Sequence, residues 1–278
     1  MKFFLSLFLI SLGLSSQLPA KERIVALGGP VTEIVFALGA GENVVAVDQS
    51  SLYPEAATER PQVGYVGAIG SEGILAMNPT LILATDRLGP PAARQQLENS
   101  GIPLKIISNP NTAESLQKAV LELGQALDRT TEAESLWNEI QAGLEAVQPL
   151  AEESGDPRIA FLMGNNGIPL AAGRDTQADG MIQLAGGRNV FQQYNGYKPV
   201  SEEALISADL DVILVASHRA PEDADPRDRL RDLGLTSLAR STTSKVLLVD
   251  LSYYLSFGPR TGQAALELAK RINEAPSS

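Results

Sequence analysis

Short apolar runs and amphipathic segments alternate along the first part of the chain. Residues 23–27 are an apolar run that ends at a Gly-Gly-Pro turn, and residues 31–38 then carry apolar side chains at helical spacing. The alternation continues with strand-like runs at 43–47, 80–84 and 104–107 and helix-like segments at 71–77 and 92–100. This pattern predicts a parallel sheet flanked by helices.

The middle of the chain, residues 112–153, is rich in Ala, Leu, Glu and Gln, which are strong helix formers. It predicts one helix over 112–127 and a longer, continuous helix over 132–152. The longer helix would extend roughly 30 Å at about 1.5 Å per residue. Because a helix of that length resists bending, we expect only small opening motions between the parts it joins.

Strand-like and helix-like segments alternate again in the C-terminal part. The predicted strands are 158–163, 211–216 and 245–250. The predicted helices are 176–185, a helix that starts at Ser201, and 262–273. The acidic stretch around 220–226 is predicted to be a solvated loop.

Three blocks of the chain occur twice in the same order. Leu38-Gly39-Ala40-Gly41 resembles Leu184-Ala185-Gly186-Gly187, and Gly64-Tyr65 with the later Ser71-Glu72 resembles Gly196-Tyr197 with Ser201-Glu202-Glu203. The strand-like residues that follow each block also match. Self-similarity at a long period identifies the structural unit of a fold. We therefore expect two related lobes with a cleft between them, which is a preferred place for ligands.

These patterns predict an α/β fold of two similar lobes, each a mostly parallel sheet with flanking helices, joined by one long backbone helix. The expected boundaries are a signal peptide at 1–20, an N-terminal lobe at 21–127, an interlobe helix at 128–154 and a C-terminal lobe at 155–278.

The N-terminal segment has the layout of a secretory signal. Lys2 precedes an apolar run over 3–14, and small residues lead to Ala20 before the charged Lys21. The run is shorter than the roughly 20 residues that a membrane span needs, so we expect cleavage after Ala20. The chain has no Cys for lipid attachment. We therefore expect a free periplasmic protein of a bacterium with two membranes.

Composition narrows the classes of function. The chain has 22 Lys and Arg against 33 Asp and Glu, a formal charge of −11, which becomes −12 once Lys2 is removed with the signal. Such acidity argues against binding nucleic acid or anionic lipid, because that binding depends on Lys and Arg. A single His, no Cys and no Gly-x-Ser-x-Gly motif leave no obvious nucleophile and base for an enzyme. A binding protein for free Zn or Mn ions is also disfavoured, because such sites usually gather several His or carboxylates.

Several motifs together closely resemble the periplasmic haem-binding proteins of ABC-type haem importers, within the helical-backbone binding proteins that also serve cobalamin and ferric siderophores. The resemblance covers essentially the whole mature chain. Its motifs are Arg23 to Leu27 with Thr32-Glu33-Ile34, the Gly64-Tyr65 block, Leu170 to Thr176, Leu184 to Gly187, Gly196 to Pro199, and Phe257-Gly258-Pro259-Arg260.

The resemblance implies capture of ferric haem between the lobes and delivery to an ABC importer permease dimer. It also implies a monomer that meets the membrane only through the permease. A cobalamin or ferric-siderophore binding protein of the same fold remains the alternative. The number of haems bound stays open.

Tyr65 matches the family's haem-iron ligand. A phenolate is a hard oxygen donor suited to ferric iron, but a phenol with a solution pKa of about 10 needs the metal or a cation to ionise near neutral pH. Many relatives place an Arg two residues later, where this chain has Gly67. Arg87 and Arg174 are candidate substitutes, or partners of a haem propionate, or solvated surface charges.

Three aromatic residues after the strand 245–250, namely Tyr253, Tyr254 and Phe257, could cover a porphyrin face. On an extended segment the two tandem tyrosines point in different directions, so at most one would face the cleft. Arg260 resembles a family position, and a role at a helix start is open to it as well. The chain's histidine, His218, does not lie in the segment 163–167 where a second iron ligand is expected, so we predict a five-coordinate Tyr65 site.

The resemblance also implies that one glutamate per lobe docks into arginine pockets on the two permease subunits. Glu72 and Glu203 hold equivalent positions in the first turns of helices that Ser71 and Ser201 are predicted to cap. Glu33 and Glu202 are the neighbouring alternatives.

Overall fold

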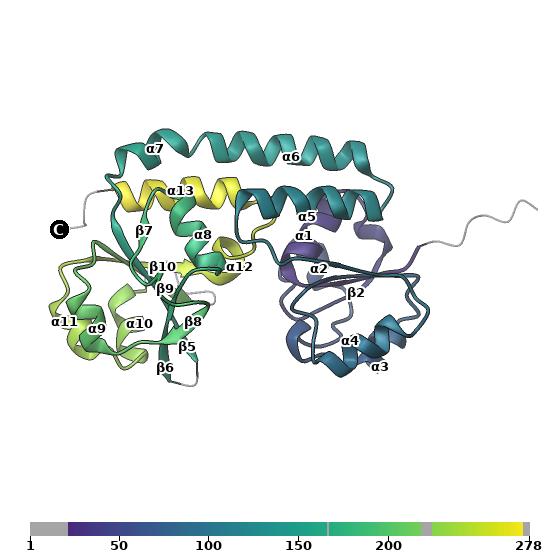
Figure 1. The fold of residues 1–278 in the computed structure, drawn as a ribbon, viewed down its shortest axis with the longest axis horizontal. Coiled ribbons are helices and arrows are strands. Elements are labelled where there is room, and N and C mark those ends of the chain that lie inside the picture. Colours follow the sequence, from purple (N-terminus) through teal and green to yellow (C-terminus); the bar gives the residue numbers. More distant parts are fainter. Residues whose placement is uncertain (1–21, 166, 218–223, 275–278) are drawn as a thin grey trace, which may run out of the picture.

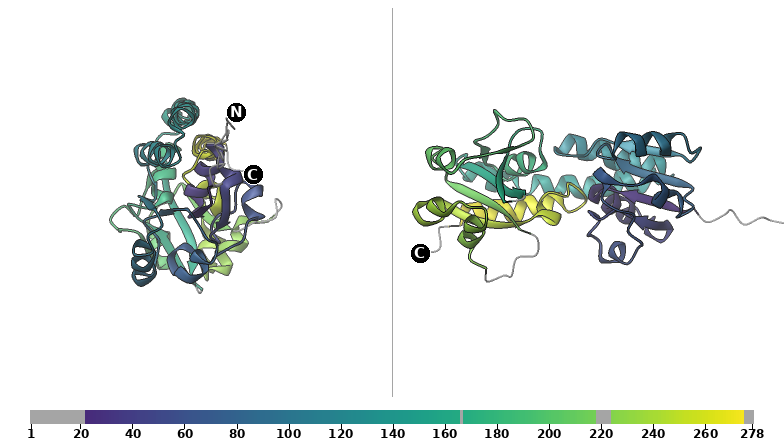
Figure 2. Two further views of the ribbon diagram at one scale, coloured as in Figure 1. Left: turned by 90° about the vertical axis from the view of Figure 1, so that its right-hand side faces the viewer. Right: turned by 90° about the horizontal axis from the view of Figure 1, so that it is seen from below.

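The computed structural model describes residues 22–165, 167–217 and 224–274, without the side chain of residue 165. The predicted signal peptide, His218 and most of the acidic loop lie outside these residues. Two lobes lie side by side, and a pair of helices extends across both of them (Figures 1 and 2). None of the helices in the described ranges combines the length and apolarity that crossing a membrane requires.

The N-terminal lobe contains a parallel sheet whose strand order, over the described residues, is β2-β1-β3-β4. The strands are β1 (Ile24–Leu27), β2 (Val44–Val47), β3 (Leu81–Thr85) and β4 (Leu104–Ile107). β1 and β3, in the middle, are buried along their whole length. Strands that are covered on both faces appear in sequence as continuous apolar runs, which is why they were predictable.

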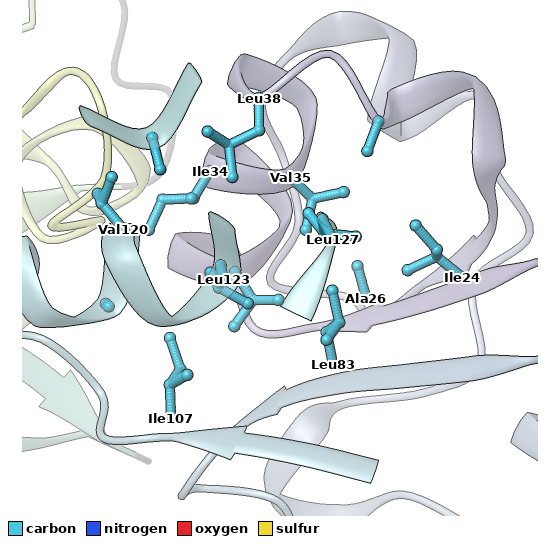
Figure 3. Close-up of a cluster of buried hydrophobic side chains, with 14 of the residues drawn as sticks. Ile24, Ala26, Ile34, Val35, Leu38, Leu83, Ile107, Val120, Leu123 and Leu127 are labelled. Carbon is cyan, nitrogen blue, oxygen red and sulfur yellow. The ribbon is translucent and has the colours of Figure 1, made fainter. Parts of the chain in front are cut away.

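Helices cover both faces of this sheet. Ile24, Ala26 and Leu83 face the core beneath α1 (Gly29–Ala37) and α5 (Ala113–Ala126), as Figure 3 shows, whereas Val25, Leu27 and Ile82 face the other side. The remaining elements are η1 (Gly41–Asn43), α2 (Glu55–Thr58), η2 (Val66–Ala68), α3 (Ser71–Leu75) and α4 (Pro91–Glu98).

The sheet of the C-terminal lobe is mixed. Its described strands run in the order β10-β9-β5-β6-β8, with β7 also paired to β5. β5, β7, β9 and β10 are parallel, but β6 returns antiparallel to β5 and pairs antiparallel with β8. The strands are β5 (Arg158–Asn165), β6 (Ile168–Ala172), β7 (Arg188–Asn189), β8 (Tyr197–Pro199), β9 (Val212–Ser217) and β10 (Lys245–Asp250).

Six helices surround the second sheet in the described part of the chain: α8 (Gln177–Leu184), α9 (Glu202–Ser207), α10 (Pro226–Asp232), α11 (Thr236–Ser241), α12 (Leu251–Tyr254) and α13 (Thr261–Asn273). The sequence analysis missed α10 and α11. Asp225, assigned there to the acidic loop, caps α10 by accepting a hydrogen bond from the Arg227 N–H at 2.9 Å. An Asp followed by Pro is a typical helix start.

The predicted continuous helix over 132–152 is two helices, α6 (Thr130–Glu145) and α7 (Gln148–Glu153), which follow one another across both lobes (Figure 1). Pro149 explains the break, because it has no N–H to donate to Glu145 and its ring clashes with that carbonyl. The Val147 N–H bonds to the Leu144 carbonyl at 3.1 Å, three residues back.

The C-terminal helix α13 packs against α6. At their crossing, a Cβ atom on Gly262 would lie 2.8 Å from the carbonyl carbon of Gly143. Glycine at this position lets the two backbones approach closely. The last helix of the second lobe is thereby held to the helix that leaves the first lobe.

Candidate functional site

A pocket of about 670 Å³ lies between the lobes, and residues of both lobes line it. The N-terminal lobe contributes the loops that follow its parallel strands, at 28–30, 49–53, 85–87 and 109. Ligands of open α/β sheets typically bind outside the carboxyl ends of the strands. The second lobe contributes four apolar side chains, which are Met163, Leu170, Leu251 and Leu255, together with polar residues and Tyr197.

Tyr65 lines this pocket with 49% of its surface exposed. Its loop starts at Gly64, whose φ of 112° favours glycine, and leads into η2. Backbone hydrogen bonds fix the loop on both sides. The Gln49 N–H donates to the Gly64 carbonyl at 2.8 Å, and the Gly89 N–H donates to the Val66 carbonyl at 3.0 Å.

Gly67 provides room for the Tyr65 ring. A Cβ atom on Gly67 would lie 3.1 Å from Cε1 of Tyr65 and 3.8 Å from the Arg87 carbonyl oxygen. The loops that carry Tyr65 and Arg87 are therefore neighbours. The glycine that replaces the expected arginine lies beneath the phenol ring.

Arg87 is exposed and lines the pocket. The ion pairs formed by the described residues do not include it. The other predicted arginine, Arg174, is exposed beside Asp175 at 3.8 Å and is not among the pocket residues. Of the two candidates, the structure brings Arg87 into the site with Tyr65 and leaves Arg174 outside it.

Tyr197, the counterpart of Tyr65, also borders the pocket but is half-buried. Burial raises the pKa of its phenol to about 12, which the Arg87 charge and hydrogen bonds with Thr176 and Ala178 only partly oppose. Its ring meets Phe161 edge-on, with the centroids 6.4 Å apart. Tyr197 is therefore a neutral phenol held by its own lobe.

The aromatic residues predicted to cover a porphyrin lie elsewhere. Tyr254 and Phe257 are 3% and 1% exposed, in the core of the C-terminal lobe, and Tyr253 stacks edge-on against Tyr254 with a centroid distance of 5.0 Å. The prediction assumed an extended segment, but α12 is helical there. On this helix and in the residues just after it, Leu251, Ser252, Leu255 and Ser256 line the pocket, whereas Tyr254 and Phe257 face the core.

Arg260 does not line the pocket. It connects the two lobes beside it. Its Nε and Nη2 donate to the carboxylate of Glu33, from α1, at 3.0 and 2.7 Å, and Ser256 Oγ donates to the same carboxylate at 2.5 Å. Glu33 is 4% exposed. This bidentate pair joins residues 227 positions apart.

Tyr53 is a pocket residue that the sequence analysis missed. It is 44% exposed, and the Arg260 guanidinium lies 3.8 Å from its ring centroid. The available signal was an apolar Leu52-Tyr53 pair directly after a buried strand, in a loop where the carboxyl ends of strands meet.

The predicted docking glutamates are exposed on separate lobes, Glu72 on α3 and Glu203 on α9. Both helices lie on the side of the molecule opposite α6 and α7 (Figure 1). Ser201 caps α9 as predicted, accepting a hydrogen bond from the Ala204 N–H at 3.2 Å. Ser71 does not cap α3. Gly70 holds that position, and Ser71 Oγ donates to Gln96 Oε1 at 2.5 Å.

Glu33 and Glu202, the neighbouring alternatives for docking, both interact with other residues of the protein. Glu33 is buried in the ion pair with Arg260. Glu202 accepts a hydrogen bond from the Leu238 N–H at 2.8 Å. Both carboxylates are therefore held by other parts of the protein.

Comparisons with known proteins agree with this architecture. The family model described as "Periplasmic binding protein" matches residues 24–239. The periplasmic haem-binding protein RhuT from Roseiflexus sp. RS-1 is 36% identical, with a TM-score of 0.83 over 91% of this chain and 98% of that one. A periplasmic haem-binding protein from Pseudomonas aeruginosa is 29% identical, with a TM-score of 0.82 over 92% and 95% of the two chains. A vitamin B12-binding protein of Vibrio parahaemolyticus is 26% identical over 79% of each chain.

Proposed function

We propose that this chain, which belongs to the periplasmic binding protein family, captures ferric haem between its two lobes and delivers it to an ABC-type importer of the inner membrane. The observation that carries the proposal is the composition of the pocket. Most of its surface is apolar, and it includes the exposed side chain of Tyr65 and the Arg87 guanidinium, which forms no ion pair within the described part of the chain. An apolar macrocycle with a ferric centre and carboxylate groups is complementary to this set.

Tyr65 is the proposed iron ligand. Its side chain is exposed at the pocket, and any side chain larger than that of Gly67 would crowd its ring. Ferric iron lowers the energy of the phenolate, and a nearby guanidinium favours the same charged form. Arg87, from the adjoining loop, is the proposed cation of the pocket in place of the arginine that Gly67 replaces.

Cobalamin and ferric siderophores are the competing ligands. Cobalamin is an alternative because a relative that is 26% identical is a vitamin B12-binding protein. The exposed phenol favours haem. Haem iron offers an open axial position to Tyr65, whereas a siderophore already saturates its iron. The proposal assigns the chain binding and delivery, without catalysis.

The test is to titrate the purified mature protein with ferric haem and, separately, with cobalamin, and to record visible spectra. We expect saturable haem binding with a tyrosinate-to-iron absorption that Tyr65→Phe removes without changing the circular dichroism spectrum. Spectral saturation by cobalamin but not by haem would overturn the ligand assignment.

Residues 1–20 are the proposed cleavable signal that sends the protein to the periplasm. Cell fractionation followed by N-terminal sequencing would test this. A mature chain that begins at Lys21 in the periplasmic fraction is expected, and an uncleaved chain in the cytoplasm would contradict the assignment. Light scattering of the same material is expected to give a monomer.

Glu72 and Glu203 are the proposed contacts with the two permease subunits. Exposed carboxylates at equivalent places on two lobes suit a partner with two similar subunits, and charge complementarity would set orientation and encounter rate. Glu72→Ala combined with Glu203→Ala is expected to abolish haem uptake in reconstituted vesicles without changing haem affinity. The matched control replaces Glu114 and Glu132, exposed first-turn glutamates of α5 and α6, which should leave uptake normal.

A further inference from the structure

Asp48 directly follows β2, and its side chain has no exposed surface. The described residues nevertheless donate five hydrogen bonds to its carboxylate. Oδ1 accepts from the Gly28 N–H at 2.8 Å and from Ser51 Oγ at 2.7 Å. Oδ2 accepts from the Ser50 N–H at 3.0 Å, from Ser50 Oγ at 2.7 Å and from the Val66 N–H at 3.3 Å.

These donors belong to three separate loops. Gly28 is in the turn after β1, Ser50 and Ser51 follow β2, and Val66 is the residue after Tyr65. The first two loops line the pocket beside Tyr65. A single carboxylate therefore holds together three segments of the pocket wall, including the segment that carries the phenol.

The network has a defined direction. The hydroxyl hydrogen of Ser51 is used in its hydrogen bond to Asp48. In the 2.6 Å hydrogen bond between Ser51 Oγ and Thr32 Oγ1, Thr32 must therefore be the donor. Thr32 lies on α1, the helix that also carries Glu33. In all five hydrogen bonds the partner donates and Asp48 accepts, as expected for an ionised carboxylate, which has no hydrogen to donate.

We propose that Asp48 is a positioning residue for Tyr65, fixing the phenol at the point where an iron ligand is needed. The inference rests on the proposed haem function, because it concerns the geometry of the same ligand. Tyr65 is an exposed residue on a loop, and its own ring makes no aromatic pair among the described residues. Its direction therefore depends on the backbone on either side, and Asp48 holds the C-terminal side.

Asp48→Asn tests the proposal. The variant keeps the size of the side chain but turns one acceptor oxygen into an NH₂ group that faces other donors. The matched control is Asp179→Asn in the other lobe. Asp179 is also buried, at 6% exposed, and accepts hydrogen bonds from Asn189 and Gln183, both at 2.9 Å, but it does not border the pocket.

Two measurements are made on each protein. The first is amide hydrogen exchange without haem, where we expect faster exchange over residues 64–69 in Asp48→Asn and wild-type exchange there in Asp179→Asn. The second is the ferric-haem titration. Here Asp48→Asn is expected to bind about tenfold or more weakly and to lose most of the tyrosinate absorption. Asp179→Asn should keep both the affinity and the absorption.

Val66→Pro is the second variant, used if Asp48→Asn does not fold. It removes the N–H that reaches Asp48 while placing Pro at the first residue of η2, where helices tolerate it. The same loss of tyrosinate absorption is expected. Wild-type absorption and affinity in a folded Asp48→Asn or Val66→Pro protein would overturn the proposal.

The two proposals fail in different ways. If the wild-type protein does not bind haem, the haem assignment is wrong, and faster exchange over 64–69 in Asp48→Asn still supports the role of Asp48 in holding the loop. If wild-type protein binds haem through Tyr65 and Asp48→Asn behaves like it in both measurements, the function stands and the positioning role is wrong.

Discussion

The two lobes hold equivalent tyrosines in different physical states. Tyr65 is 49% exposed at the pocket, whereas burial raises the pKa of Tyr197 to about 12 and its phenol is hydrogen-bonded within its own lobe. The repeated sequence blocks therefore duplicate the scaffold and not the chemistry. A match between repeats locates a candidate residue, but the surroundings decide whether that residue can bind a ligand.

The sheets explain the difference. Tyr65 lies in a loop beyond the parallel strands of its lobe. Tyr197 is the first residue of β8, where it pairs with Ala172 of β6 in the antiparallel part of the second sheet. A strand residue is fixed by ladder hydrogen bonds and packs its ring against neighbours such as Phe161, so its phenol cannot turn freely toward a ligand.

Removing Arg260 breaks the connection between these two unlike lobes and has the largest expected effect. Arg260→Ala leaves the Glu33 carboxylate buried without its cation, a change that typically costs about 3–5 kcal/mol. Urea unfolding followed by circular dichroism should show this loss. The double variant Glu33→Ala with Arg260→Ala should recover part of it, and a double variant no more stable than Arg260→Ala alone would contradict a buried ion pair.

The tyrosine pair itself provides the next test. Tyr65→Phe should weaken ferric-haem binding about 100-fold, which corresponds to about 3 kcal/mol, because an iron ligand is lost. Tyr197→Phe removes the equivalent hydroxyl from the other lobe and should change the affinity by less than about threefold. Equal effects of the two substitutions in a haem titration would mean that the lobes contribute equally.

A smaller effect is expected from the arginines. Arg87→Ala should weaken haem binding about tenfold, because the pocket loses a cation that can meet a carboxylate group of the ligand. Arg174→Ala, which replaces another exposed arginine that does not line the pocket, is the control. An effect of Arg174→Ala as large as that of Arg87→Ala would show that the second lobe supplies the cation.

The smallest effect concerns alkaline pH. Burial raises the folded-state pKa of Tyr197 from 10.0 to about 12, so the folded state holds this phenol protonated. Its contribution to stability is complete below about pH 10 and is lost as the pH rises toward 12. When the pH rises from about 9 to about 11, the unfolding free energy should fall by roughly 1 kcal/mol more in the wild-type protein than in the Tyr197→Phe variant.

Much of the fold was predictable because its signals are local. β1, β3 and α5 follow from apolar runs and helical spacing within a few turns of chain. The break between α6 and α7 was also visible in the sequence as Pro149, but the strong helix formers on either side outweighed it in the prediction. The antiparallel return of β6 also had a local signal, the Asn166-Gly167 pair between two apolar runs, which is typical of a two-residue hairpin and which the prediction did not use.

The site was predictable only in part. Tyr65 and Arg87 line the pocket, whereas Tyr254 and Phe257 are buried in the core of the C-terminal lobe. Tyr254 lies on α12, which is helical where an extended segment was assumed, and Phe257 follows that helix. The role of Arg260 depends on Glu33, which is 227 positions away in the chain. A pairing at that separation follows from how the two lobes meet, which no local pattern records.

The bond between Glu33 and Arg260 has a consequence for import. Because it joins the lobes through side chains of the protein alone, it would limit any change in the spacing between Glu72 and Glu203 when a ligand binds. On the proposed docking, the transporter would then bind both forms with similar affinity, and empty protein would act as a competitive inhibitor. The rate of import would therefore follow the loaded fraction of the periplasmic pool, and making more of the protein while haem is scarce would slow uptake.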